Sequence, residues 1–211
     1  GSGNVAQYAV EKILEMGGKV YAMSDSRGTL HDKEGFDKDK LDHVKHLKNV
    51  LRVPLSTYTE KYPKAKFLSG KKPWKIPCDI AFACATQNEI LKDDAENLVS
   101  NNCMAVVEGA NMPVSLEGLK VLQKKGVLFA PGKAANAGGV SISGLEMSQN
   151  SLRIQWTREE VDRKLRGIMK SIHSTCVKYG RCEGREIDYV KGANIGGFIK
   201  VADSMLSCGV I

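Results

Sequence analysis

Three small residues near the first position of the sequence have the spacing of a phosphate-binding turn. Gly1, Gly3 and Ala6 stand in GSGNVA, and apolar residues then recur at helical spacing until Gly17. Glycines at such a turn let the backbone approach a pyrophosphate, while the N-terminus of the following helix faces the anion. The pattern predicts a dinucleotide-binding turn whose preceding strand lies outside the sequence; the alternative is a remnant of an expression tag.

An acidic residue follows at the end of the next apolar run. Residues 19–26, KVYAMSDS, are typical of a strand that Asp25 closes, which is the order of elements in a βαβ nucleotide unit. A carboxylate there suits the ribose 2′-hydroxyl of NAD and repels the 2′-phosphate of NADP. Ser26, Arg27 and Lys48 favour the phosphate instead, so these residues leave the choice of cofactor open.

Small and amide residues cluster after three later apolar runs. They lie in CATQN (84–88), EGAN (108–111) and PGKAANAGG (131–139). Ligands of open α/β sheets bind beyond the carboxyl ends of the strands, and amides read a carboxamide or a ribose hydroxyl without adding charge. We therefore expect these loops to line one site.

Each loop also has a purely structural interpretation. Thr86 with Glu89, and Ser143 with Glu146, have the spacing of capping boxes at helix starts. Asn111, before Met-Pro, is a typical turn residue. Taken singly, each loop leaves both interpretations open, whereas several such loops at consecutive strand ends favour a site.

The elements that position these loops alternate between strand and helix. Continuous apolar strands between amphipathic helices are typical of a parallel sheet covered on both faces. The predicted fold class is therefore α/β, a Rossmann-like, doubly wound, mostly parallel sheet with a C-terminal helical segment. Strands are predicted within 19–26, 64–69, 78–84, 104–109 and 127–131, and helices within 4–16, 36–53, 88–102 and 115–126.

The sequence changes character at Gly138. We expect residues 1–137 to form a dinucleotide-binding domain and residues 138–211 to be helical, either covering the sheet or leaning across to another domain. Thr157 and Glu160 predict a capping box at one helix start. The helical segments are 143–156, 157–180 and 188–211.

Composition narrows the function classes. The 211 residues carry a net charge of +7, spread along amphipathic helices without interleaved aromatic residues, so we expect no nucleic-acid partner. No apolar run has the length of a membrane span, and we expect no membrane partner. Six cysteines without a Cys-x-x-Cys pair predict reduced thiols in the cytoplasm. His43 and His46 lack a third ligand nearby, so we expect a solvated helix face and no metal.

Seven segments occur in an order that resembles one enzyme family. They are GSGNVAQYA, SDSRGT, CATQNE, EGANMP, APGKAANAGGV, SGLEMSQNS and GANIGGFIKVADSM. The sequence is similar over its whole length to glutamate dehydrogenases, and more narrowly to the hexameric, NADP-dependent kind. In this family an acidic residue at the Asp25 position does not exclude NADP.

The resemblance assigns roles to particular residues. It implies that Val140 and Ser143 meet the glutamate side chain, with the Ser143 hydroxyl on the γ-carboxylate. The implied NADP ligands are Gly1, Gly3, Asn4 and Val5 at the pyrophosphate, Asp25, Ser26 and Lys48 at the adenosine ribose and its phosphate, Ala85, Thr86, Asn88, Gly109, Ala110 and Asn111 towards the nicotinamide ribose, and Asn136 near the nicotinamide.

The resemblance also implies what these residues do not supply. The family's reaction is the reversible oxidative deamination of L-glutamate to 2-oxoglutarate and ammonia, and its catalytic lysine and aspartate belong to an N-terminal domain. We therefore expect no catalytic residue in this sequence and no turnover by the chain alone. The C-terminal helices should bridge to the N-terminal domain. The intact enzyme is expected to be a cytoplasmic homo-hexamer. The alternatives are a leucine, phenylalanine or valine dehydrogenase, which Ser143 disfavours because those enzymes need an apolar floor, and a non-catalytic nucleotide-binding module.

Overall fold

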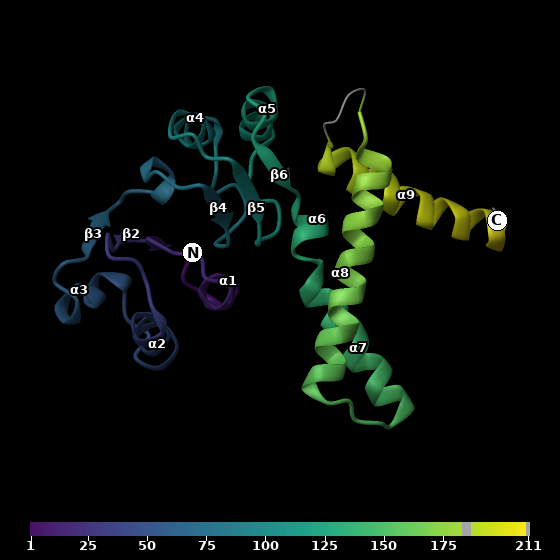
Figure 1. Ribbon diagram of the computed structural model, residues 1–211, viewed down its shortest axis with the longest axis horizontal. Helices are drawn as coiled ribbons and strands as arrows, with labels where there is room; N and C mark the ends of the chain where they lie inside the picture. Colours follow the sequence, from purple (N-terminus) through teal and green to yellow (C-terminus); the bar gives the residue numbers. More distant parts are fainter. Residues whose placement is uncertain (183–186, 210–211) are drawn as a thin grey trace. The chain divides into compact units, whose positions relative to one another are not determined.

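The computed structural model describes residues 1–182 and 187–209 (Figure 1). The chain divides into two compact units, Gly1–Leu128 and Phe129–Ile211, and each is described by itself. The first unit contains strands and helices, whereas the described residues of the second unit are mostly helical.

Two three-stranded sheets are present in the described chain. In the first, β1 (Ala22–Asp25) pairs with β2 (Gly28–His31), and β2 pairs with β3 (Lys66–Ser69), both in antiparallel register. In the second, β4 (Ile80–Ala83) and β5 (Ala105–Glu108) are parallel, and the order is completed by β6 (Leu128–Ala130). The carboxyl ends of β4 and β5 therefore meet at one edge.

Five helices accompany these sheets, and their starts follow from local chemistry. Asp37 accepts the Lys40 N–H at 2.8 Å, and the Ser115 hydroxyl accepts the Gly118 N–H at 3.1 Å, so both residues satisfy helix donors that otherwise lack partners. The helices are α1 (Asn4–Glu15), α2 (Lys38–Lys45), which continues as a π-helical turn over His46–Val50, α3 (Tyr58–Lys61), α4 (Lys92–Ser100) and α5 (Leu116–Lys124), with short 3₁₀ turns at Leu55–Thr57 and Pro73–Lys75.

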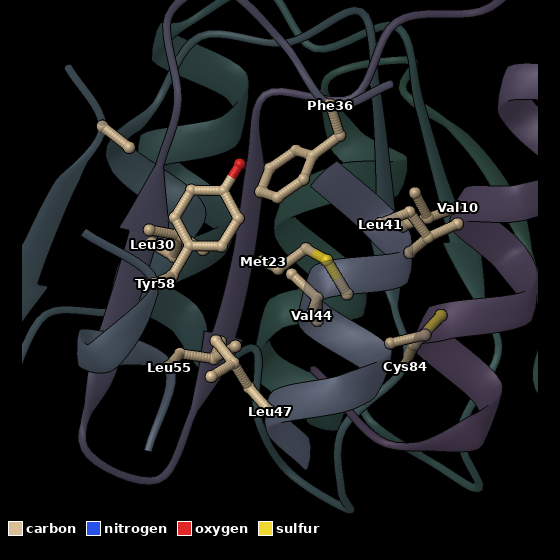
Figure 2. Packing of buried hydrophobic residues seen from close by; sticks show 12 residues of the cluster. Val10, Met23, Leu30, Phe36, Leu41, Val44, Leu47, Leu55, Tyr58 and Cys84 are labelled. Atoms are coloured by element: carbon tan, nitrogen blue, oxygen red, sulfur yellow. The ribbon is translucent and has the colours of Figure 1, made fainter. Parts of the chain in front are cut away.

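The core of the first unit lies between α1, α2 and the antiparallel sheet (Figure 2). Leu41 and Val44 are three residues apart on α2 and share its buried face, while Leu30 enters from β2. Leu30 and Val44 are fully buried, and burying such a side chain contributes about 1.5–3 kcal/mol. This packing fixes α1, and with it the turn that precedes α1.

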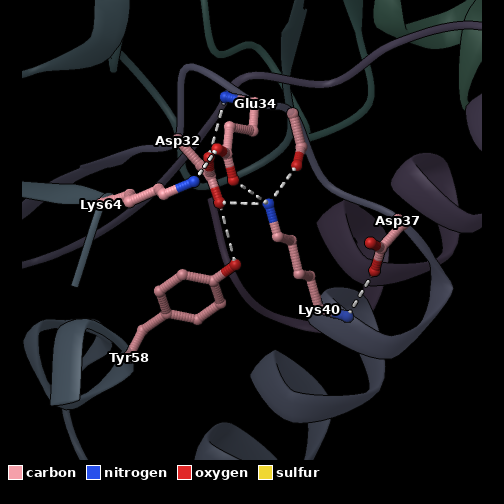
Figure 3. Close-up of polar contacts among 7 residues, drawn as sticks. Asp32, Glu34, Asp37, Lys40, Tyr58 and Lys64 are labelled. Carbon is pink, nitrogen blue, oxygen red and sulfur yellow. Dashed lines mark hydrogen bonds and ion pairs between the residues drawn. The ribbon is translucent and has the colours of Figure 1, made fainter. Parts of the chain in front are cut away.

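A polar network anchors the loop between β2 and α2 (Figure 3). The Lys40 ammonium lies 2.8 Å from the Asp32 carboxylate and donates to the Gly35 carbonyl at 2.9 Å. The Asp32 carboxylate also accepts hydrogen bonds from the Tyr58 hydroxyl at 3.3 Å and from the Glu34 N–H at 3.0 Å. A buried carboxylate with these partners holds the loop in one conformation.

Helices make up most of the second unit. The predicted capping box is confirmed, since the Glu160 N–H donates to the Thr157 hydroxyl at 3.2 Å and the Thr157 N–H donates to Glu160 at 2.7 Å. At the contact between the last two helices, a Cβ on Gly192 would lie 2.0 Å from the Cys176 carbonyl oxygen, so only glycine fits. The helices are α6 (Gly132–Ala135), α7 (Ala137–Leu152), α8 (Arg158–Gly180) and α9 (Tyr189–Cys208).

The structure confirms the predicted α/β class and each of the five predicted strands, with differences in detail. The parallel prediction holds for β4 and β5, but β1, β2 and β3 are antiparallel, and β2 was not predicted. The helix predicted from residue 88 begins at Lys92, and that predicted from 143 begins at Ala137. The solvated face predicted for His43 is wrong, because its ring packs against Tyr58 and Tyr62 with centroids 5.7 and 5.6 Å away.

Candidate functional site

A cavity of about 690 Å³ lies where α1, β1 and β4 meet, within the first unit. It sits at the carboxyl ends of β1 and β4 and at the N-terminus of α1, which is where open α/β folds bind ligands. The residues that line it are Gly1, Ser2, Gly3, Asn4, Val5, Ser24, Asp25, Ser26, Gly28, Gly70, Lys71, Lys72, Pro73, Trp74, Cys84, Ala85, Thr86 and Glu89.

Gly1 passes between the end of β1 and the end of β4. Its carbonyl accepts the Ser24 N–H at 3.2 Å, and a Cβ at this position would lie 2.8 Å from the carbonyl oxygen of Cys84. A backbone oxygen cannot move away from a methyl group as a flexible side chain can. Glycine is therefore required here by the close approach of two backbones.

Gly3 has the opposite surroundings. A Cβ on Gly3 would meet no described atom within 4 Å, and the residue lines the cavity. Gly3 is the N-cap of α1, and in the described chain no side chain caps this helix and its first turn holds no acidic residue. The first backbone donor that pairs within the helix is the Gln7 N–H, which bonds the Gly3 carbonyl at 2.9 Å. A helix N-terminus open in this way favours an anion, so the turn fits a pyrophosphate.

Asp25 is held by the protein itself. Its carboxylate, with the side chain only 8% exposed, accepts the N–H groups of Arg27 and Leu55, both at 2.9 Å. Lys48 places its ammonium 3.8 Å from Asp25 and donates to the Val53 carbonyl at 3.3 Å. Ser26 is exposed at the cavity, whereas Lys48 is not among the lining residues. Much of the Asp25 charge is thus satisfied internally.

The wall opposite α1 is built around Glu89. The Ala85 N–H donates to the Glu89 carboxylate at 2.8 Å, while Lys72 and Trp74 donate to the Glu89 carbonyl at 2.9 and 3.2 Å. Burial raises the pKa of Glu89. No helix begins at Thr86, so the capping-box interpretation of Thr86 and Glu89 is wrong; the carboxylate closes a loop instead.

Sequence reasoning missed this wall. Lys71, Lys72 and Trp74 line the cavity, yet in the sequence they belong to an irregular, lysine-rich stretch. The only signal is KKPW, two cations followed by a buried aromatic residue, which by itself does not differ from a solvated loop. Lys72 also pairs with Asp94 at 2.6 Å, which ties the wall to α4.

Four further predicted residues lie beside the cavity and do not line it. Asn88 donates its N–H to the Met112 carbonyl at 3.1 Å, which joins the loops after β4 and β5. A Cβ on Gly109 would lie 3.2 Å from a Val5 methyl, so Gly109 adjoins the start of α1. The N–H groups of Gly109 and Ala110 both donate to the Ala83 carbonyl at 2.9 Å. Asn111 is exposed and precedes Met112, whose φ of 47° marks the turn.

The remaining predicted residues belong to the second unit. Asn136 is the residue before α7, and Val140 and Ser143 lie one turn apart on an exposed face of that helix. Val140 is 72% exposed, and the Ser143 hydroxyl makes only a long hydrogen bond of 3.4 Å to the Gly139 carbonyl. Ser143 lies inside α7, so its interpretation as a capping box with Glu146 is wrong.

Two searches cover the described ranges 1–182 and 187–209. In these ranges no three His, Cys, Asp or Glu side chains are placed to hold a metal ion. Within the same residues no helix combines the length and the apolar character that a membrane crossing requires.

The fold and the open helix N-terminus define a Rossmann-like α/β protein. Residues 1–209 match the model of the glutamate/leucine/phenylalanine/valine dehydrogenase family, and the chain belongs to this family. It is 54% identical over 211 residues to a glutamate dehydrogenase of Bacteroides thetaiotaomicron, covering 100% of this chain and 47% of that protein.

Other relatives agree. The chain is 52% identical to the NADP-specific glutamate dehydrogenase of Escherichia coli K12, again covering 100% of this chain and 47% of the relative. A solved structure of Plasmodium falciparum glutamate dehydrogenase 2 superposes with a TM-score of 0.94 at 52% identity, over 99% of this chain and 46% of that one. The chain thus spans about half the length of the relatives that it matches.

Proposed function

We propose that this chain is the cofactor-binding part of an NADP-dependent glutamate dehydrogenase, which interconverts L-glutamate with 2-oxoglutarate and ammonium. The observation that carries the proposal is the uncapped start of α1, where Gly3 opens into the cavity beside the ends of β1 and β4. The names of the 52–54% identical relatives support the choice of reaction.

In this proposal, backbone N–H groups at Gly3, Asn4 and Val5 hold the pyrophosphate, since these residues line the cavity at the helix start. Ala85 and Thr86 bind the cofactor from the end of β4. Asn88, Gly109, Ala110 and Asn111 lie beyond them, towards the nicotinamide ribose, and Asn136 is assigned to the nicotinamide. The bound nicotinamide would supply the hydride acceptor or donor.

The surroundings of Asp25 support NADP over NAD. Its carboxylate already accepts two backbone N–H groups and faces Lys48, so it repels a 2′-phosphate less than a free carboxylate would. Ser26 offers a hydroxyl at the same edge, and Lys71 lines the cavity without an ion pair to any described residue. We assign the 2′-phosphate to Ser26, Lys48 and Lys71.

The substrate side is assigned to α7. Val140 and Ser143 present a methyl-bearing and a hydroxyl-bearing side chain on one exposed helix face. A hydroxyl suits the γ-carboxylate of glutamate, whereas a leucine or phenylalanine dehydrogenase would need an apolar group there. We propose that the catalytic lysine and aspartate come from outside these 211 residues, that residues 138–211 bridge to the domain that carries them, and that the intact enzyme is a cytoplasmic homo-hexamer.

The test is an initial-rate assay of the full-length enzyme with 2-oxoglutarate and ammonium, comparing NADPH with NADH. A rate that strongly favours NADPH supports the proposal. If the enzyme instead uses only a branched or aromatic oxo acid, the family assignment stands and glutamate is refuted as the substrate. The substitutions Lys48→Ala and Lys71→Ala should each weaken the binding of NADPH more than the binding of NADH. Lys64→Ala, at a residue that does not line the cavity, is the matched control.

A further inference from the structure

Two of the six cysteines form a pair at the edge of the parallel sheet opposite the cavity. The register places Ile80 of β4 opposite Ala105 of β5, so Cys78 and Cys103, each two residues earlier, face each other. The pairing continues to that point, since the Met104 N–H donates to the Asp79 carbonyl at 2.8 Å. The Cys103 thiol donates to the Ala105 carbonyl at 3.2 Å and lies 3.7 Å from the carbonyl of Asp79, the residue that follows Cys78.

This geometry meets the requirements of a disulfide. Neighbouring strands lie about 4.7–4.9 Å apart, which is within the Cα separation of about 4.4–6.8 Å that disulfides span. Since the two cysteines occupy directly opposite positions where paired strands begin, a disulfide requires the side chains to rotate and the backbones to stay paired. Other described cysteines lack such a partner: Cys84 and Cys176 are buried, and burial raises the pKa of both thiols.

We propose that Cys78 and Cys103 are a thiol modification site, which a small hydroperoxide converts to a disulfide and a thiol reductant restores. The site is independent of the proposed cofactor function. Cys103 is only 3% exposed, so a small oxidant suits the pair and a bulky one does not.

The electrons and atoms balance in two steps. The Cys103 thiolate attacks one peroxide oxygen, the O–O bond breaks, and the hydroxide that leaves takes a proton to become water, so Cys103 becomes a sulfenic acid. The Cys78 sulfur then attacks the Cys103 sulfur and displaces its hydroxyl, which leaves as water with the Cys78 proton. Two thiols are oxidised and one hydrogen peroxide is reduced to two waters.

The acidity of the pair agrees with this order. Interaction with the neighbouring Cys78 thiol lowers the pKa of Cys103 to about 7, which gives a substantial thiolate fraction at neutral pH. The same interaction, together with burial, raises the pKa of Cys78. Cys103 is therefore the attacking sulfur and Cys78 the one that resolves the sulfenic acid.

The experiment treats the reduced full-length enzyme with hydrogen peroxide, blocks remaining thiols, digests with trypsin and sequences linked peptides by mass spectrometry. Cys103 falls in peptide 93–120, while peptide 76–92 contains both Cys78 and Cys84, so fragment ions between these two must locate the bond. We expect a Cys78–Cys103 link that forms faster with peroxide than with oxidised glutathione and disappears on reduction.

Variants sharpen the result. Cys78→Ser should abolish the link and leave a sulfenic acid on Cys103 that dimedone traps, whereas Cys182→Ser, at an exposed thiol, should leave the link intact. A link from Cys103 to another cysteine would overturn the proposal, as would the absence of any link under conditions that oxidise Cys182. The wild-type peptide map decides the matter even if a variant fails to fold.

Discussion

Two lysine–carboxylate pairs near the β2–α2 loop have nearly the same length and very different surroundings (Figure 3). The Lys40–Asp32 pair measures 2.8 Å, and its side chains are 11% and 2% exposed. The Lys64–Glu34 pair measures 2.7 Å, and its side chains are 78% and 53% exposed. Replacing each lysine with methionine therefore compares the same loss of charge at different burial.

Lys40→Met should destabilise the first unit strongly. It leaves the Asp32 carboxylate buried with only the Tyr58 hydroxyl at 3.3 Å and the Glu34 N–H at 3.0 Å. Breaking a buried pair costs about 3–5 kcal/mol, and since two hydrogen bonds remain we expect about 3 kcal/mol, or roughly a 100-fold change in an opening equilibrium. Lys64→Met removes a solvated pair, and we expect almost no change.

The effect should depend on pH. Burial acts to raise the pKa of Asp32, but the hydrogen bonds, chiefly that from Lys40, bring it below its usual value. In the wild type, the resulting stability is present above the unfolded pKa of about 3.9 and is lost as the pH falls through the folded value. Without Lys40 burial dominates and the pKa of Asp32 rises, so protonation relieves the buried charge and the penalty shrinks towards pH 5.

Hydrogen exchange of the full-length enzyme, followed by mass spectrometry, measures this locally. Peptides covering α2, Lys38–Lys45, should exchange about 100-fold faster in Lys40→Met than in the wild type at pH 7, and the ratio should narrow at pH 5. Lys64→Met should match the wild type at both pH values. Equal ratios for the two variants, or a Lys40→Met ratio that does not change with pH, would refute the argument.

Three further predictions concern packing, titration and cofactor binding. Gly192→Ala should destabilise the enzyme by about 1–3 kcal/mol in thermal unfolding because its Cβ would meet the Cys176 carbonyl at 2.0 Å, whereas Gly197→Ala on the same helix, with no described atom within 4 Å, should be neutral or slightly stabilising. Burial lowers the pKa of His43, so its contribution to stability is present above the unfolded pKa of about 6.5 and lost as the pH falls through the folded value; His43→Phe should flatten the dependence of the melting temperature on pH between about 5 and 7. Gly3→Val should raise the NADPH Kd at least about tenfold without loss of fold, and unchanged fluorescence titrations would remove Gly3 from the site.

Local sequence patterns were enough for the strands but not for how the strands pair. Apolar runs located β1, β4, β5 and β6, because a buried strand needs apolar side chains, whereas the partly buried β3 contributes only Phe67 and Leu68 as apolar residues. β2, Gly28–His31, was missed because glycine, threonine and histidine leave only Leu30 as a strong apolar signal. Its pairing with β3 joins residues such as Leu30 and Phe67, which are distant in the sequence. No local pattern contains that information.

In the candidate site, too, residues with local chemistry could be predicted from the sequence and residues that depend on long-range contacts could not. The turn from Gly1 to Val5 is a continuous segment whose chemistry is local, and its predicted residues line the cavity. The facing wall depends on contacts across the chain, since Lys72 reaches the Glu89 carbonyl and the Asp94 carboxylate. Those contacts arise only after α4 and the preceding loop have packed, so Lys71, Lys72 and Trp74 could not be assigned to a site from their spacing.

The capping boxes explain why spacing alone was ambiguous. The same pattern, a hydroxyl residue followed three positions later by glutamate, occurs at Thr57, Thr86, Ser143 and Thr157. Thr57 precedes the short helix α3 without a side-chain cap. Of the three predicted boxes only Thr157 starts a helix, because α7 ends at Leu152 and the left-handed φ of 54° at Arg153 interrupts the backbone before Thr157.

At Ser143 nothing interrupts the helix that began at Ala137, so its hydroxyl turns back to the Gly139 carbonyl, the usual alternative for a serine inside a helix. After Thr86 the N–H groups of Asn88 and Ile90 already donate to the Met112 and Pro113 carbonyls at 3.1 and 2.9 Å. The Glu89 carboxylate accepts the Ala85 N–H instead of starting a helix. A capping motif therefore specifies a helix start only where the preceding backbone leaves the first-turn donors without partners. In the loop after β4, the same residues instead shape the wall of a cavity.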